Sequence, residues 1–180
     1  MRKFQIGVMG SAADLKYSDK IKKLAEEIGK EIAKSGNITI YGAEKDYDSL
    51  STRAARGAKS EDGMTVGVTY GKGMDIYDKE NTDIVIVTGL ERGGGREFVL
   101  SNSCDGIIAV SGGSGTLTEL AIAYQSNIPF IVMKGTGGWS DKLSDTYIDN
   151  RERVFSESAT TASEAVQKIL KIINSETTVG

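Results

Sequence analysis

Short runs of apolar residues alternate along this chain with longer stretches in which apolar and charged positions recur at helical spacing. After the first run, Ile21, Leu24, Ile28 and Ile32 fall on one helical face, and lysines and glutamates occupy the other. Strands that alternate with amphipathic helices build a parallel sheet whose faces are covered by those helices. The pattern therefore predicts an α/β chain.

The order of the predicted elements indicates one domain. The expected strands are 4–9, 38–41, 64–68, 83–88, 106–110 and 129–133, and the expected helices are about 21–32, 49–59, 96–102, 117–125 and from 161 onward. We expect the strand 83–88 to be buried and the Gly-rich segments 69–82 and 135–147 to be loops. Residues 1–180 are predicted to form a single Rossmann-like, doubly wound, mostly parallel sheet with helices on both faces.

Composition and charge indicate where this domain is located and which partners it has. The chain has 180 residues, 39% of them hydrophobic, and no apolar run near the roughly 20 residues that span a bilayer. Its first residues lead directly into a strand without a secretion signal, so we expect a cytoplasmic protein with no membrane partner. The 22 basic and 25 acidic side chains are interspersed, which argues against nucleic acid as a partner.

The absence of histidine limits the available chemistry. With no histidine and one cysteine, Cys104, the usual zinc ligands are missing. A magnesium ion bound by carboxylates is the open alternative, but nothing in the sequence supports it, and we expect no metal site. Any catalysis has to use carboxylates, hydroxyls and cations. Cys104 has no histidine to activate it and is expected to be a buried packing residue. The only tryptophan, Trp139, could stack on a base or anchor its own loop.

A glycine-rich turn carries the strongest functional signal. Glycine makes up 22 of the 180 residues, above the average of about 7%, and the excess follows predicted strands. The turn Ser111-Gly112-Gly113-Ser114-Gly115-Thr116 joins a predicted strand to a predicted helix, where free backbone N–H groups meet the ligand edge of the sheet. Its glycines allow the backbone to adopt positive φ and to approach a ligand without a Cβ in the way. The hydroxyls of Ser114 and Thr116 add hydrogen-bond donors. A phosphate-bearing ligand is the expected guest.

Two alternatives stay open for this region. The glycines could serve only a tight connection, and Glu119 could be the acidic member of a capping box, Thr116-Leu117-Thr118-Glu119, which the spacing favours. Two other phosphate signatures are missing, because the sequence has no Gly-x-x-x-x-Gly-Lys-Ser/Thr and no Gly-x-Gly-x-x-Gly after the first strand. Triphosphate hydrolysis and nicotinamide chemistry therefore lose support.

The residues 112–120, Gly-Gly-Ser-Gly-Thr-Leu-Thr-Glu-Leu, resemble the Gly-Gly-x-Gly-Thr-x-x-Glu motif of the lysine-decarboxylase-like (LOG) superfamily. The segment 96–106 resembles the arginine helix that precedes this motif. The resemblance spans most of the chain, and its central block is the specific part. It implies a Rossmann-like sheet, a homo-oligomer (dimer or tetramer), and a nucleoside monophosphate whose phosphate lies on the turn.

Within this superfamily the resemblance leaves two branches. In the phosphoribohydrolases, which cleave the N-glycosidic bond of nucleoside 5'-monophosphates, Glu119 would match the acidic residue of the motif and Arg96 its partner arginine. Lysine decarboxylation is not implied. The hydrolytic branch has Arg-Lys where this chain has Arg96-Glu97, and a Gly-Gly-Gly type turn where this chain has Gly42-Ala43-Glu44. An Arg-x-x-x-Leu helix (Arg96 to Leu100) followed by the Gly-Gly-x-Gly-Thr turn is more similar to the molybdenum cofactor carrier and uncharacterised Rossmann-like branch. The resemblance implies that members of this branch bind a phosphorylated pterin cofactor or have no assigned ligand.

Further candidate residues lie at the ends of the predicted strands. Gly10 and Ser11 follow the first strand and Gly42 ends the second, so all three are expected ligand contacts beside the turn. The alternative for Ser11 is an ordinary helix-initiating turn. Arg92 and Arg96 flank three glycines and could either reach a ligand phosphate or stay on a solvated surface.

Three functions from different classes remain. We rank first a carrier or binding protein for a phosphorylated nucleotide-like ligand, either a nucleoside monophosphate or the molybdenum cofactor, with no further cofactor required. A phosphoribohydrolase that uses Glu119 and Arg96 comes second. An oligomeric scaffold with a vestigial site comes third.

Overall fold

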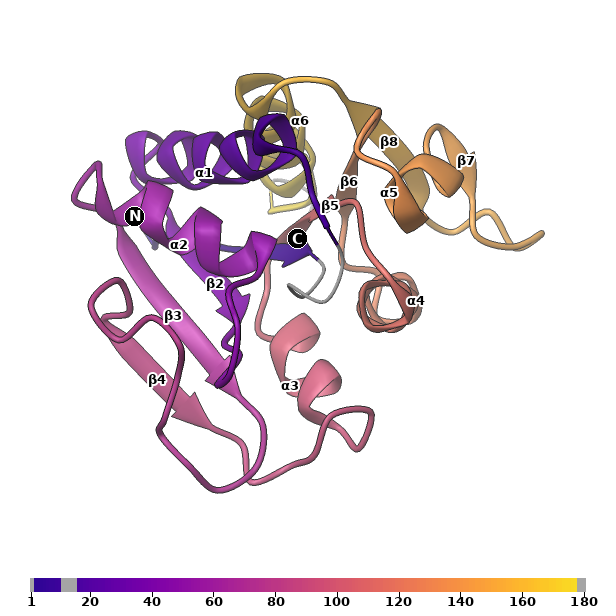
Figure 1. The fold of residues 1–180 in the computed structure, drawn as a ribbon. Coiled ribbons are helices and arrows are strands. Elements are labelled where there is room, and N and C mark those ends of the chain that lie inside the picture. Colours follow the sequence, from indigo (N-terminus) through magenta and orange to yellow (C-terminus); the bar gives the residue numbers. More distant parts are fainter. Residues whose placement is uncertain (1, 11–15, 178–180) are drawn as a thin grey trace.

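Eight strands form one sheet in the computed structural model, which describes residues 2–10 and 16–177 (Figure 1). The strands are β1 (Gln5–Gly10), β2 (Ile38–Gly42), β3 (Met64–Thr69), β4 (Ile84–Val87), β5 (Gly106–Val110), β6 (Phe130–Met133), β7 (Thr146–Tyr147) and β8 (Phe155–Ala159). The helices are α1 (Asp19–Lys34), α2 (Leu50–Lys59), α3 (Arg96–Asn102), α4 (Ser114–Gln125), α5 (Gly138–Lys142) and α6 (Ala162–Thr177). The described chain is a single α/β domain, as the sequence predicts.

The strand order reverses between β1 and β5. The order across the sheet is β4-β3-β2-β1-β5-β6-β8-β7, and all neighbours are parallel except β7 and β8. From β1 the chain adds β2, β3 and β4 on one side, and it then returns to add β5 on the other. Gly10 at the end of β1 pairs in register with Val110 at the end of β5. Open α/β sheets bind ligands beyond the carboxyl ends of the strands at such a reversal.

Helices cover both faces of the sheet, which confirms the doubly wound prediction (Figure 1). The apolar sides of α1, α2 and α6 pack on one face, where Ile108 and Val110 of β5 join them. Those of α3, α4 and α5 pack on the other face, against Ile107 and Ala109. Because successive residues of a strand point to opposite faces, β5 contributes to both cores, and all of its residues are buried.

Two glycines bring α1 and α2 into close contact. A Cβ on Gly29 would lie 1.8 Å from the carbonyl oxygen of Ala54, and a Cβ on Gly57 would lie 1.9 Å from the carbonyl oxygen of Glu26. No larger residue fits between these backbones, so the two glycines fix how closely the helices cross.

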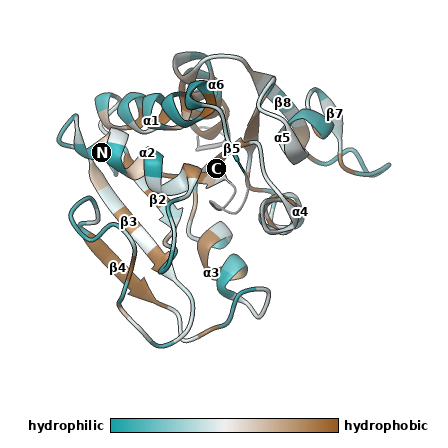
Figure 2. Cartoon of the chain, viewed as in Figure 1, coloured by the Kyte–Doolittle hydropathy of each residue, from teal (hydrophilic) through white to brown (hydrophobic). Residues whose placement is uncertain are grey.

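Several predicted elements need correction. The strand expected to be buried at 83–88 is β4, which lies at the edge of the sheet with Ile84 47% exposed. The connection from β3 to β4 contains no helix that could cover β4. Figure 2 shows the hydrophobic residues of β4 at the margin of the fold. The segment 135–147, expected to be a loop, contains α5 and β7. The strand β8 was not among the predicted strands, because its sequence Phe-Ser-Glu-Ser-Ala has few apolar residues.

Candidate functional site

The turn after β5 is held from behind by the segment that leads into α5. The N–H of Ser111 donates to the hydroxyl of Thr136 at 2.8 Å, and the N–H of Trp139 donates to the carbonyl of Gly112 at 3.0 Å. The hydroxyl of Ser140 also donates to the carbonyl of Ser111 at 2.8 Å. The segment 135–147, predicted to be a loop, thus supports the turn through these hydrogen bonds.

The front of the turn is open. The sequence suggests that the glycines of the turn adopt positive φ, but only Gly112 does so, with φ +106°. Gly113 has φ -96°, and Gly115 also lies outside the positive-φ region. A Cβ on Gly113 or Gly115 would meet no heavy atom within 4 Å. The fold itself therefore does not require glycine at 113 and 115, and their small size matters only to something that approaches the turn.

The first turn of α4 has no side-chain cap. The helix begins at Ser114, not at 117, with Gly113 as its N-cap and no capping hydrogen bond from a side chain. Thr116 lies inside the helix, so the capping box with Glu119 that the spacing favours is wrong. Uncapped N–H groups at the positive end of a helix form a natural anion site.

A cavity of about 270 Å³ opens in front of the turn. Its walls come from the ends of β1 and β2, the start of α2, the α3 region and the start of α4. They consist of Gly10, Gly42, Glu44, Ser49, Ser51, Arg92, Arg96, Glu97, Gly113, Ser114, Gly115, Thr116 and Glu119. Most of the predicted site residues thus lie around one cavity. Gly112 shapes the turn without lining the cavity, and Ser11 lies outside the described residues.

Four lining residues were not among the predicted site residues. Glu44 follows β2 at the ligand edge of the sheet, and its position could have suggested it. Ser49 and Ser51 begin α2, where Ser49 is the N-cap and accepts from the N–H of Thr52 at 3.0 Å. In the sequence, Glu97 stands out only because the hydrolytic branch has lysine at this position.

Arg96 is buried among three carboxylates. Its Nη2 lies 3.5 Å from Glu44 and 3.8 Å from Glu97, and its Nη1 lies 3.8 Å from Glu119. A Cβ on Gly42 would lie 2.0 Å from this guanidinium, so the glycine that ends β2 makes room for it. The Nε of Arg96 is buried without a hydrogen-bond partner among the described residues. At 5% exposure, the solvated-surface alternative for Arg96 is wrong.

The carboxyl of Glu119 has an unusual protonation equilibrium. Burial raises its pKa to about 7, Arg96 acts in the opposite direction, and the nearby Glu97 and Glu44 raise it further. At neutral pH a substantial fraction of this group is therefore neutral, and the charge of the cavity depends on pH.

Arg92 forms the rim of the cavity. Its guanidinium donates to the carboxylate of Glu44 and to the hydroxyl of Tyr47, and it lies 5.0 Å from the ring centre of Tyr70. It comes from the loop before α3, in which the N–H of Gly93 donates to Glu97 at 3.0 Å. Arg92 is half-exposed and lines the same cavity as Arg96.

Two other candidates lie outside this cavity. Cys104 is buried, its Sγ lies 3.2 Å from the carbonyl of Leu100, and burial raises the pKa of its thiol, as expected for a packing residue. Trp139 packs against the apolar core, with the Nζ of Lys142 4.3 Å from its ring centre, and anchors its segment.

Neither a metal cluster nor a membrane span is found in the described chain. Within residues 2–10 and 16–177, no group of three or more carboxylate or cysteine side chains is placed to hold a metal ion. No helix in the same part of the chain is both long enough and apolar enough to cross a membrane.

The sequence matches known proteins over most of its length. The model of the SLOG cluster4 family matches residues 3–169. An uncharacterized protein from Archaeoglobus fulgidus is 32% identical over 125 residues, which cover 69% of this chain and 76% of that protein.

Two solved structures with similar folds have names that mention a ligand. The molybdenum cofactor binding protein of Rippkaea orientalis has a TM-score of 0.79 and 29% identity, and the match covers 96% of this chain and 99% of that one. The molybdenum cofactor carrier protein of Chlamydomonas reinhardtii has a TM-score of 0.77 and 31% identity, with 94% and 99% covered.

Proposed function

We propose that this chain, which belongs to the SLOG cluster4 family, binds a small phosphorylated ligand of the molybdenum cofactor type and carries it without chemical turnover. The observation that carries the proposal is the open, uncapped first turn of α4, which lines a cavity together with a buried arginine. The similarity to two proteins named for binding or carrying this cofactor supports the ligand class. A nucleoside monophosphate presents the same phosphate and is the alternative ligand.

The residues present fit a phosphorylated cofactor. The backbone N–H groups from Gly113 to Thr116, with the hydroxyls of Ser114 and Thr116, would hold the phosphate. The Nε of Arg96, buried without a partner in the described chain, would gain an acceptor from it. Gly10 and Gly42, which line the same cavity, would border the rest of the ligand; Ser11, which follows Gly10 in the sequence, stays a candidate contact outside the described residues. The cofactor supplies redox chemistry to the enzyme that receives it, and here the residues only bind and orient it.

Retention of the cofactor tests this proposal. Purified protein is mixed anaerobically with molybdenum cofactor released from a molybdoenzyme, and the protein peak from gel filtration is assayed for molybdenum and for oxidised pterin fluorescence. We expect close to one cofactor per chain, and loss of retention in Gly115→Ala. Gln125→Ala, an exposed change at the other end of the same helix and outside the cavity, is the matched control. Absence of cofactor from the wild-type peak would overturn the proposal.

A phosphoribohydrolase is the second candidate. It is favoured by Glu119, a buried carboxyl beside Arg96 in the cavity that contains the phosphate turn. Cleavage of an N-glycosidic bond through a cationic sugar needs a carboxylate near the anomeric carbon. Incubation with nucleoside 5'-monophosphates and chromatography for free base tests it. Release that disappears in Glu119→Gln would establish the enzyme, and cofactor retention without release would establish the carrier. A protein that does neither matches the vestigial scaffold.

Exposed apolar side chains support a homo-oligomer, as a dimer or a tetramer. On β4 the side chains of Ile84, Ile86 and Val87 are exposed, and so is Phe98 on α3. An edge strand with exposed apolar side chains is a ready template for pairing with another chain. Light scattering on the purified protein gives the mass directly, and a mass equal to that of one chain would remove this proposal.

The remaining proposal concerns location and partners. A single cysteine that is buried and free supports a cytoplasmic location, where thiols stay reduced. The net charge of -3 supports a small ligand rather than nucleic acid as the partner. Cell fractionation and a gel-shift assay with mixed nucleic acids test the two parts.

A further inference from the structure

The carboxylate of Glu44 lies between two arginines. One of its oxygens, Oε2, accepts a hydrogen bond from Arg92, and the other, Oε1, lies 3.5 Å from Nη2 of Arg96. All three residues line the cavity in front of the turn. Arginines are also the residues with which proteins most often hold the oxygens of a carboxylate or phosphate group of a ligand. A side chain of the protein itself thus occupies an anion-binding position.

The balance of charge makes Glu44 a competitor for an anionic ligand. The described lining contains two cations, Arg92 and Arg96, and three carboxylates, those of Glu44, Glu97 and Glu119. The carboxylates lie 3.5–3.8 Å from the guanidinium of Arg96, beyond the roughly 2.7–3.2 Å of an N–H···O hydrogen bond. The N–H groups of Arg96 are thus available to a better-placed oxygen, and a ligand that supplies one has to displace a carboxylate.

Glu44 is the one of these three carboxylates that reaches the rim of the cavity. Glu97 accepts from the N–H of Gly93 at 3.0 Å and so holds the loop before α3. Glu119 is buried within α4. Glu44 instead contacts Arg92, which is half-exposed. Exchange of this carboxylate therefore requires a change of side-chain rotamers at the rim and no movement of a helix.

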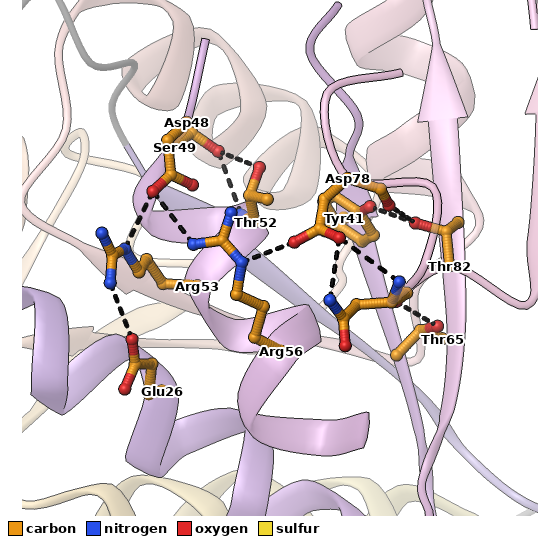
Figure 3. Close-up of polar contacts among 11 residues, drawn as sticks. Glu26, Tyr41, Asp48, Ser49, Thr52, Arg53, Arg56, Thr65, Asp78 and Thr82 are labelled. Carbon is orange, nitrogen blue, oxygen red and sulfur yellow. Dashed lines mark hydrogen bonds and ion pairs between the residues drawn. The ribbon is translucent and has the colours of Figure 1, made fainter. Parts of the chain in front are cut away.

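The backbone behind Glu44 is anchored by hydrogen bonds. Its carbonyl accepts from the N–H of Tyr77, in the connection from β3 to β4, at 2.8 Å. The next residue, Asp78, accepts from Nε of Arg56 on α2, and its carbonyl accepts from the hydroxyl of Thr82 at 2.7 Å (Figure 3). This wall of the cavity is tied to α2, so we expect a change on ligand binding to fall on side chains at the rim.

Two tyrosine rings keep Arg92 at the rim. Its guanidinium carbon lies 5.6 Å from the ring centre of Tyr47 and 5.0 Å from that of Tyr70. A guanidinium that packs on aromatic rings keeps N–H groups in its plane that can donate to an anion. Arg92 can therefore exchange one oxyanion for another while the two rings hold it in place.

We infer that Glu44 is a built-in competitor for the ligand, whose carboxylate holds Arg92 and Arg96 until an oxyanion group of the ligand takes its place. The inference rests on the proposed function, because it takes the same cavity as the ligand site. Displacement of Glu44 costs free energy, so Glu44 lowers the affinity for the ligand. The same carboxylate returns to the arginines when the ligand leaves, which suits a carrier that has to hand its ligand on.

Removal of the negative charge tests this inference. Affinities for the molybdenum cofactor, kept anaerobic, and for adenosine 5'-monophosphate are measured by equilibrium dialysis. We expect the ligand that the wild-type protein binds to bind at least tenfold more tightly to Glu44→Gln. Glu44→Ala should show a gain of the same sign, so the result does not depend on how glutamine packs. Glu91→Gln removes the same charge from an exposed residue next to Arg92 in sequence, outside this cavity, and should change the affinity less than twofold.

A double variant tests the part of Arg92. Arg92→Gln alone should weaken binding about tenfold, because the ligand loses one of its two arginines. In that background, Glu44→Gln should raise the affinity less than threefold, because the carboxylate no longer bridges two arginines. An equal gain in both backgrounds would overturn the exchange at Arg92.

The outcomes separate this inference from the proposed function. Unchanged or weaker binding to Glu44→Gln, while the wild-type protein still binds the cofactor, overturns the inference and leaves the proposed function standing, because Glu44 then only orients the arginines. An equal gain from Glu91→Gln also overturns the inference, since the effect would be one of overall charge. Binding of adenosine 5'-monophosphate alone, with the tenfold gain, supports the inference and removes the cofactor as the ligand. Failure of both ligands to bind either protein overturns both proposals.

Discussion

Replacing Gly115 with alanine should separate the stability of this protein from its ability to bind a ligand. Gly115 lies in the first turn of α4, outside the positive-φ region, and a Cβ there would meet no atom within 4 Å. Alanine is favoured over glycine within a helix by roughly 0.5–1 kcal/mol. For a chain of this size each kcal/mol corresponds to about 2–4 °C. We therefore expect the melting temperature to rise by about 1–4 °C.

The effect on binding should have the opposite sign. The new methyl group would point into the space from which a phosphate approaches the N–H groups of the turn. A hydrogen bond to a charged group contributes about 1.5–3 kcal/mol, so loss of one such bond weakens binding by roughly 10- to 150-fold. Thermal melts of the free protein and dialysis with the cofactor measure the two effects separately.

A second glycine in the same turn provides the contrast. Gly112 has φ +106°, and a Cβ on it would lie 2.6 Å from the side chain of Thr116. Gly112→Ala should therefore lower the melting temperature as well as the affinity. Unchanged ligand affinity in Gly115→Ala would refute the argument that the open face of α4 holds the phosphate. A lower melting temperature of the same variant would refute the argument that a Cβ at position 115 meets no other atom.

Three further predictions concern stability, pH and assembly. The pKa of Glu119 is raised from 4.5 to about 7, so the free energy of unfolding is highest below about pH 4.5 and falls as the pH rises through 7. Between about pH 5 and pH 8 the loss should be on the order of 3 kcal/mol. Glu119→Gln should remove this pH dependence, which urea titrations at the two pH values measure. Gly29→Ala should destabilise the fold by about 1–3 kcal/mol because its Cβ would clash with a backbone carbonyl, whereas Lys30→Ala should not. Ile86→Lys on β4 should lower the mass measured by light scattering, because it places a charge on the exposed apolar edge of the sheet that the proposed oligomer would cover; an unchanged mass would contradict contact through this edge.

Most helices and strands were predictable because the pattern of apolar residues that indicates each of them lies within the element itself. The run of β5, Gly106–Val110, is apolar throughout because both of its faces are buried, and the bounds of α3 agree with the prediction. β4 has an equally apolar sequence but lies at the edge of the sheet. Whether a strand is central or at an edge depends on what packs over it, and the absence of a covering helix between β3 and β4 is not visible in the strand itself.

The site was predictable where it depends on glycine and less so where it depends on charge. The turn at 111–116 could be recognised because glycines follow a strand and precede a helix. The burial of Arg96 could not, because it results from Gly42 on a strand far away in the sequence leaving room for the guanidinium. The spacing of Thr116 and Glu119 indicated a capping box, but an earlier helix start moved both residues into the helix.

The charge distribution of the cavity favours holding a ligand over cleaving one. Arg96 has Glu44, Glu97 and Glu119 as ion-pair partners, so a phosphate that approaches it competes with carboxylates already present. The uncapped N–H groups of α4 face no such competition, and they are better placed to provide most of the affinity. A carboxylate that stabilises a cationic sugar has to be ionised, whereas burial keeps a substantial fraction of Glu119 neutral at pH 7. A neutral Glu119 also leaves Arg96 one charged partner fewer, which strengthens its attraction for a phosphate without supplying the charge that cleavage needs.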